Sequence, residues 1–337
     1  MKKIVPFLKI LVPLALGVFL VWYMYDSLSD KERQDVFSAF GKANYFFLVL
    51  SFIFGLMAHL SRAIRWRYMF EPLGKNIGLW NSFNAIMAGY FINLLAPRAG
   101  EPARAGFISN YEDVPFEKSF GTIVAERVID LAMLGIIVLI TLFLQFDKLD
   151  QFKEILSQAT GNVEQGKTHW FTYVTYLIAA VIVIVVILSI FHKGLRTKVI
   201  KLLMGMWEGL KSIFKLKKRK EYLGHTLLIW LMYLMMFGVC YQAIEDTSSL
   251  GLGAMLAGFV AGTIGVILVQ GGLGIYPIFV GAAITLYIGA SPGSDSVLNL
   301  NAYALGWLIW LTQIVLIIPI GILSLILMPI QNKDVER

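Results

Sequence analysis

Residues 119–144 read SFGTIVAERVIDLAMLGIIVLITLFL, and this stretch decides the fold class. A helix needs about 20 mostly apolar residues to cross the hydrocarbon core of a bilayer, and this run exceeds that length. Further apolar segments lie on both sides of it, at 4–25, 44–61, 80–96, 170–191, 223–243, 251–269, 271–290 and 302–329. The sequence therefore predicts an all-α, polytopic helical membrane protein with about six to nine membrane segments.

The overall composition excludes soluble classes of protein. Of the 337 residues, 58% are hydrophobic and 15% are charged, and the mean hydropathy is +0.71. A soluble domain is about 45–50% apolar and about 25% charged. The single cysteine, Cys240, excludes an intrachain disulfide and a cysteine-based metal cluster, and the four histidines show no ligand spacing. We therefore expect one integral membrane domain over residues 1–337, with no metal and no cofactor.

The basic residues indicate how the chain is oriented. Lys and Arg total 29 against 22 Asp and Glu, a net charge of +7. These cations cluster beside apolar segments, so the positive-inside rule explains them better than nucleic-acid binding does. It places both termini, residues 62–78 and residues 193–220 in the cytoplasm, and residues 145–169 outside, in a multi-pass protein of the plasma (inner) membrane. The cations that assign residues 62–78 to the cytoplasm are Arg62, Arg65, Arg67 and Lys75.

Residues 193–220 alternate apolar and basic positions at helical spacing. This pattern favours an interfacial helix that lies against anionic lipid headgroups. A cytoplasmic linker whose charges only fix the topology is the alternative.

The number of crossings predicts a re-entrant segment. A chain that is cytoplasmic at 62–78 and external at 145–169 crosses an odd number of times, yet two apolar segments lie between. We therefore expect about 80–108 to form a hairpin that enters and leaves on one side. Residues 251–290 are either a second hairpin or two spans. Because residues 85–91 (AIMAGYF) resemble residues 254–260 (AMLAGFV), the chain is interpreted as an inverted repeat with halves 1–145 and 170–330.

The break in the first hairpin carries charges at membrane depth. Pro97 and Pro102 interrupt a helix and Gly100 permits a tight turn. The guanidinium of Arg98 or Arg104 suits a phosphodiester because it offers paired donors and keeps its charge. Glu101 would pair an arginine or meet a cationic headgroup. An ordinary loop with solvated charges is the alternative. The candidate substrate-binding residues here are Asn93, Pro97, Arg98, Gly100, Glu101 and Arg104.

Three charged residues interrupt the apolar run 119–144, namely Glu126, Arg127 and Asp130. Each charge near the bilayer centre costs roughly 2.5–3.5 kcal/mol on insertion scales, so such residues are rarely kept without a partner or a purpose. Arg127 can reach Asp130 three positions later along a helix. The three residues form either a salt-bridged cluster that locks helices together or a polar wall that faces the first hairpin.

The stretch 270–277 (QGGLGIYP) interrupts the second apolar pair. Its glycines allow close backbone approach, and freed N–H groups there can bind an anionic oxygen. Close helix packing through small residues is the alternative. The candidate residues are Gln270, Gly271, Gly272, Gly274 and Tyr276.

Together, the motifs at 93–104, 126–130 and 271–274 resemble the lysylphosphatidylglycerol synthase transmembrane family over roughly residues 5–330. The resemblance implies a lipid-handling membrane domain, which in fused members moves aminoacylated phosphatidylglycerol between leaflets. It also implies functional roles for the charged and proline or glycine positions at 97–104 and 126–130. Family members often carry an acidic residue shortly after the glycine run, where this chain has Tyr276 and Pro277.

We therefore expect a flippase-like protein that handles an anionic phospholipid or an isoprenoid-phosphate lipid. We do not expect a bound nucleotide to drive its activity. The chain ends at Arg337 without an aminoacyl-transferase domain, so we do not expect it to be an enzyme of that kind. A non-transporting scaffold for envelope biogenesis and an intramembrane lipid-modifying enzyme are the alternatives. Membrane lipids are the expected partners, with no nucleic acid, and the oligomeric state is open.

Overall fold

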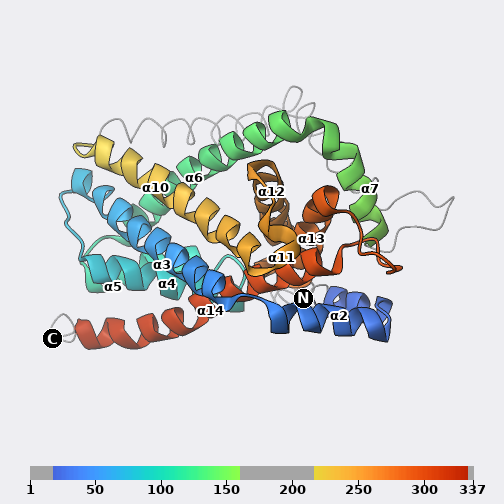
Figure 1. The fold of residues 1–337 in the computed structure, drawn as a ribbon. Coiled ribbons are helices and arrows are strands. Elements are labelled where there is room, and N and C mark those ends of the chain that lie inside the picture. Colours follow the sequence, from blue (N-terminus) through green and yellow to red (C-terminus); the bar gives the residue numbers. More distant parts are fainter. Residues whose placement is uncertain (1–17, 160–215, 333–337) are drawn as a thin grey trace, which may run out of the picture.

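The computed structural model describes residues 18–159 and 216–332, and these residues form helices and connecting turns without a strand (Figure 1). Residues 18–27 are helical and precede the first labelled helix. The predictions for 170–191 and 193–215 lie outside the described residues. The helices are α2 (Asp30–Lys42), α3 (Tyr45–Tyr68), α4 (Leu79–Leu95), α5 (Gly100–Tyr111), α6 (Phe116–Gln145), α7 (Leu149–Ala159), α10 (Arg219–Gly238), α11 (Glu245–Ser248), α12 (Leu252–Leu268), α13 (Ile275–Ile288) and α14 (Leu300–Gln331).

Four helical stretches within the described residues are long and apolar enough to cross a membrane. They are Tyr45–Leu73, Phe116–Ala159, Arg219–Ala243 and Leu300–Gln331. The predicted all-α, polytopic membrane fold is thereby confirmed. At its centre α3 and α10 lie side by side (Figure 1), where the Ser51 hydroxyl donates to the Met236 carbonyl at 2.7 Å.

The first predicted hairpin is present as α4 and α5, joined by a break at residues 96–99. Helix α5 has 12 residues, so it is about 18 Å long and too short to span the bilayer. Its end returns to the start of α4, because Glu112 Oε1 accepts a hydrogen bond from the Gly78 N–H at 2.8 Å. A Cβ on Gly100 would collide with the Gly89 carbonyl, so the two helices touch backbone to backbone.

Residues 251–290 form two antiparallel helices, α12 and α13, and their short lengths favour the hairpin over two spans. These helices have 17 and 14 residues, with a break at residues 269–274. The elements that flank the hairpin meet at one end, since the Asn301 amide donates to Asp246 Oδ2 at 2.6 Å. The hairpin therefore enters and leaves on the same side, at the end of the molecule where α2 and α7 lie (Figure 1). The first hairpin lies toward the other end, where α14 finishes.

The breaks of the two hairpins approach each other inside the protein. A Cβ on Gly271, in the second break, would lie 3.3 Å from Leu94 Cδ2 at the end of α4. Each half of the chain thus supplies, in the same order, a long helix, a hairpin and a second long helix: α3, α4–α5, α6 and then α10, α12–α13, α14. The inverted repeat with halves 1–145 and 170–330 stays a prediction that this order supports.

Helix α14 packs along both hairpins through two glycines. A Cβ on Gly306 would lie 2.8 Å from Pro277 Cα of α13, and one on Gly321 would lie 3.0 Å from the Met87 carbonyl oxygen of α4. The last long helix therefore ties the two hairpins together.

Helices α2 and α7 are amphipathic, and the sequence analysis did not predict them. Both lie at the end of the molecule where the second hairpin enters and leaves (Figure 1). Helix α7 places the Phe152 ring against Phe279 of α13, with the ring centroids 6.5 Å apart. Helix α2 is tied to residues 294–296 by Glu32, whose Oε1 accepts from the Ser294 hydroxyl and from the Ser296 N–H. Its Oε2 accepts from Ser29 at the start of α2.

Candidate functional site

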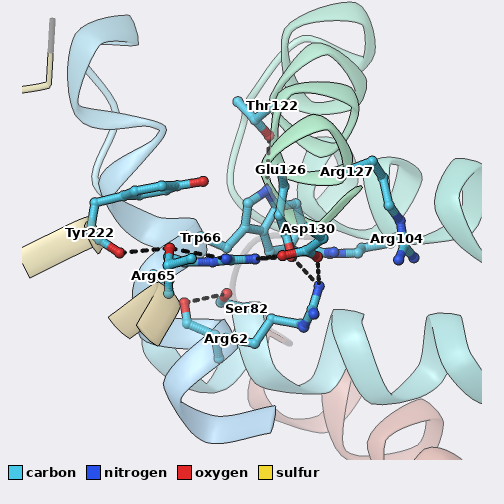
Figure 2. A network of polar contacts seen from close by, with 12 residues as sticks. Arg62, Arg65, Trp66, Ser82, Arg104, Thr122, Glu126, Arg127, Asp130 and Tyr222 are labelled. Atoms are coloured by element: carbon cyan, nitrogen blue, oxygen red, sulfur yellow. Dashed lines mark hydrogen bonds and ion pairs between the residues drawn. The ribbon is translucent and has the colours of Figure 1, made fainter. Parts of the chain in front are cut away.

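A buried ionic cluster joins α3 to α6 (Figure 2). Arg62 Nη1 lies 2.6 Å from Glu126 Oε1 and 2.7 Å from Asp130 Oδ2. Arg65 Nη2 lies 2.8 Å from Asp130 Oδ1 and 3.1 Å from Glu126 Oε1. The side chains of Arg65 and Glu126 are 0% and 1% exposed, so these charges are withdrawn from solvent. Glu126 and Asp130 thus form the salt-bridged cluster that joins helices, while the polar wall that faces the first hairpin stays a prediction.

Helical spacing explains why the cluster forms. Arg62 and Arg65 lie three positions apart on one face of α3, and Glu126 and Asp130 lie four positions apart on the facing side of α6. One turn earlier on α6, the Thr122 hydroxyl accepts from Trp66 Nε1 at 2.9 Å. Helix α3 thus continues to Tyr68, so the prediction that Arg62 and Arg65 are cytoplasmic loop cations is wrong.

A third buried arginine enters the cluster from the first hairpin. Arg104 of α5 places Nη2 2.7 Å from Glu126 Oε2, and its guanidinium carbon lies 3.6 Å from the centre of the Trp66 ring. The described cluster therefore holds three guanidinium groups against two carboxylates. It retains one excess positive charge inside the protein, which favours a visiting anion.

Arg127 lies at the edge of this cluster, and no dashed line joins it to Glu126 or Asp130 (Figure 2). The expected contact with Asp130 is wrong, because both oxygens of Asp130 are taken by Arg62 and Arg65. Arg127 Nη2 instead lies 2.8 Å from Glu101 Oε1, in the first turn of α5. This contact confirms the prediction that Glu101 pairs with an arginine.

A cavity of about 630 Å³ lies beside the cluster, where the two halves of the chain face each other. Its charged wall comes from the first half alone, namely Arg62, Arg127 and Asp130. The second half supplies mainly apolar and aromatic side chains from α10, α12 and α14. The other lining residues from the two halves include His59, Tyr90, Leu131, Leu134, Trp230, Tyr233, Met236, Phe237, Phe259, Thr263, Val266, Tyr276, Gln313, Leu316 and Ile317.

Three buried nitrogen atoms of the cavity's lining residues have no hydrogen-bond partner among residues 18–159 and 216–332. They are His59 Nδ1, Arg62 Nε and Trp230 Nε1. Buried polar groups are rarely left unpaired, because each costs about 1–3 kcal/mol. The arginine and tryptophan nitrogens are donors that lack an acceptor among the described residues.

Some of the predicted site residues of the first hairpin line a crevice, and others do not. Gly100, Glu101 and Asn93 line a narrow crevice next to Arg127, together with Arg104. Arg98 is exposed and lines neither this crevice nor the large cavity.

The helix break differs from its prediction in two details. Its left-handed residue is Arg98, with φ 63°, and Gly100 serves the close approach to α4 instead. Pro97 lies within the break, but Pro102 lies in the first turn of α5, where a missing N–H leaves no helical hydrogen bond unmade.

In the second break the freed N–H groups expected for anion binding are partly absent. The Gly272 N–H donates to the Val269 carbonyl at 2.7 Å, and the Gly271 carbonyl accepts from Trp310 Nε1 at 2.7 Å. Gly271, Gly272 and Gly274 all have positive φ, so they serve the turn. Tyr276 lines the large cavity, and its hydroxyl accepts from Gln313 Nε2 at 3.0 Å. The side chain of Gln270 lies outside the description.

Sequence reasoning missed Arg62, Arg65 and the aromatic lining residues Tyr90 and Tyr233. The signal for the arginines was their spacing on the continuing face of α3. Two carboxylates one turn apart in α6 also demand cations from a neighbouring helix. Within the described part of the chain, no three His, Cys, Asp or Glu side chains gather as metal ligands would.

Residues 10–297 match the family described as the lysylphosphatidylglycerol synthase TM region. The chain therefore belongs to this family of membrane proteins. It is similar to a UPF0104 membrane protein of Methanocaldococcus jannaschii, with 32% identity over 90 residues that cover 26% of this chain and 27% of that protein. It is also similar to a UPF0104 membrane protein of Methanothermobacter thermautotrophicus, with 25% identity over 140 residues that cover 40% of each. The matched stretches span less than half the length of these relatives, and no solved structure matches the chain.

Proposed function

We propose that this protein is a flippase-like component that moves a lipid with an anionic headgroup between the leaflets of a membrane. The observation that carries the proposal is the cavity of about 630 Å³, which combines a charged wall with an apolar remainder. A lipid likewise combines a polar headgroup, which would match the charged wall, with apolar chains, which would match the remainder of the cavity. Family membership agrees with lipid handling, since the family's name refers to a phospholipid synthase.

The headgroup would lie against the charged wall. Arg62 and Arg127 supply guanidinium donors, which suit a phosphate because of their paired geometry and permanent charge. The His59 ring lies between Tyr90 and Tyr233, at centroid distances of 5.1 Å and 6.0 Å, and closes this side of the cavity. The excess positive charge of the buried cluster supports an anionic head over a cationic one.

The tail would leave the cavity between α6 and α12. Leu131 of α6 and Val266 of α12 both line the cavity and are 55% and 40% exposed among the described residues. An opening flanked by exposed apolar side chains lets acyl or isoprenoid chains stay in the hydrocarbon while the headgroup is enclosed.

The orientation of the protein in the membrane is proposed from its basic residues. The end of the molecule where α10 begins carries the consecutive basic residues 217–220, and we place it on the cytoplasmic side of the plasma (inner) membrane. The second hairpin and α2 would then face outward. Both an anionic phospholipid and an isoprenoid phosphate fit this arrangement.

The test is leaflet exchange in vesicles that contain the purified full-length protein. Fluorescent phosphatidylglycerol and a fluorescent polyprenyl phosphate are placed in both leaflets, and the outer pool is quenched chemically. We expect faster loss of fluorescence than in protein-free vesicles, and we expect Thr263→Trp, which fills the cavity, to abolish the difference. Ile267→Trp, on the exposed side of the same helix, is the matched control and should keep exchange. Exchange that is absent with both lipids, or unaffected by Thr263→Trp, contradicts the proposal and favours a scaffold.

A further inference from the structure

The ion pair between Arg127 and Glu101 differs from every other ion pair of the site. The buried arginines share Glu126 and Asp130, whereas Arg127 pairs with a carboxylate outside that cluster. Its side chain is 45% exposed and that of Glu101 is 28% exposed, so this pair can open without burying an unpaired charge.

The side chain of Arg127 borders both the large cavity and the narrow crevice. Glu101 lines only the crevice. Turning the arginine side chain from the crevice toward the cavity would therefore separate it from Glu101. Each carboxylate oxygen of the described cluster already accepts from at least one other arginine, so Arg127 would compete there with the buried cations.

Glu101 is suited to lose its partner while it stays in place. It lies in the first turn of α5, where the helix dipole stabilises a negative charge. The preceding residue, Gly100, is pressed against the Gly89 carbonyl of α4, so the backbone that carries Glu101 is fixed. The movable partner of the pair is the long side chain of Arg127.

From these contacts we infer that Glu101 is the resident counter-ion of Arg127, and that an anionic oxygen of the lipid headgroup replaces it when the lipid enters the cavity. This inference rests on the function proposed above. Arg127 is then the residue that selects for negative charge, and Glu101 competes with the headgroup for it. Removing the competing carboxylate strengthens lipid binding, whereas a purely structural ion pair would weaken binding when broken.

The experiment measures binding of phosphatidylglycerol with brominated chains to the full-length protein in a non-ionic detergent. Quenching of tryptophan fluorescence reports occupancy, since Trp230 lines the cavity. We expect Glu101→Gln to bind about fivefold more tightly than the natural protein, the ratio typical of a partly exposed ion pair, and Arg127→Gln to bind at least tenfold more weakly. Glu117→Gln, in the exposed first turn of α6, is the matched control and should bind as the natural protein does.

The double variant Glu101→Gln/Arg127→Gln separates competition from an indirect effect. If Glu101 acts only by occupying Arg127, its substitution has no effect once Arg127 is gone, so the double variant binds like Arg127→Gln. Unchanged or weaker binding of Glu101→Gln overturns the inference, as does a fivefold gain that persists without Arg127. A natural protein that binds brominated phosphatidylglycerol no better than uncharged glucosyl diacylglycerol contradicts the proposed function itself.

Discussion

The buried cluster predicts that replacing one of its anions costs more stability than replacing one of its cations. Glu126 accepts hydrogen bonds from three arginines, at 2.6, 3.1 and 2.7 Å, and is 1% exposed. Glu126→Gln leaves those three guanidinium groups with Asp130 as their remaining carboxylate. Breaking a buried ion pair by neutralising one partner costs about 3–5 kcal/mol, and we expect a loss of this size.

Replacing one of the cations, in contrast, brings the net charge of the cluster closer to zero. Arg104→Met removes one cation from a cluster that has an excess of one, and the apolar side chain keeps contact with the Trp66 ring. The loss is one charge-assisted hydrogen bond, worth about 1.5–3 kcal/mol. Glu117→Gln, exposed on the same helix as Glu126, should change stability by less than about 0.5 kcal/mol.

The assay is unfolding in mixed micelles with increasing SDS, followed by far-ultraviolet circular dichroism. The free energies of unfolding should fall in the order Glu117→Gln, Arg104→Met, Glu126→Gln, from most to least stable. The reasoning is refuted if Arg104→Met is less stable than Glu126→Gln. It is equally refuted if Glu126→Gln differs from the Glu117→Gln control by less than about 1 kcal/mol.

Three further outcomes are expected. Gly100→Ala should destabilise the protein by about 1–3 kcal/mol because its Cβ collides with the Gly89 carbonyl. Gly106→Ala, in open space on the same helix, should be neutral or slightly stabilising. Equal melting temperatures for the two variants would contradict this packing of α5 against α4. Arg98→Gly should raise stability by about 0.5–1 kcal/mol in the same SDS titration, because φ 63° is unfavourable for arginine, and should leave phosphatidylglycerol binding unchanged. Burial alone would raise the pKa of Glu32, but hydrogen bonds from Ser294, Ser29 and Ser296 outweigh it and lower the pKa to about 2. The stability that Glu32 contributes is therefore complete above its ordinary pKa near 4.5 and is lost as the pH falls toward 2. The melting temperature of the natural protein should accordingly decline between pH 6 and pH 3, and that of Glu32→Gln should decline less.

The sequence was most informative about the long apolar helices. The predicted spans at 44–61, 119–144, 223–243 and 302–329 correspond to the four helical stretches that are long and apolar enough to cross a membrane. Counting crossings predicted the first hairpin, because the number of spans must agree with the side on which each loop lies.

The site was harder to predict because it depends on which helix faces meet. Arg62 and Arg65 were assigned to a loop since the positive-inside rule treats any cation near a span as solvated. Their charges are paired with Glu126 and Asp130, more than 60 positions later, and no local pattern reports such a contact. Arg98 was chosen for its chemistry, but it is exposed and lines neither space. The lining residues Tyr90 and Tyr233 had no charge or motif to mark them.

The attachment of α14 to both hairpins has a mechanical consequence. Its two anchoring glycines, Gly306 and Gly321, are about 22 Å apart along the helix, one fixed to α13 and the other to α4. Any separation of the hairpins must therefore bend this rod between its anchors. Pro319 lies in that interval and leaves the carbonyl of Val315 without its usual helical donor, so flexing is cheapest there. A bend of α14 at Pro319 would therefore accompany any separation of the two hairpins.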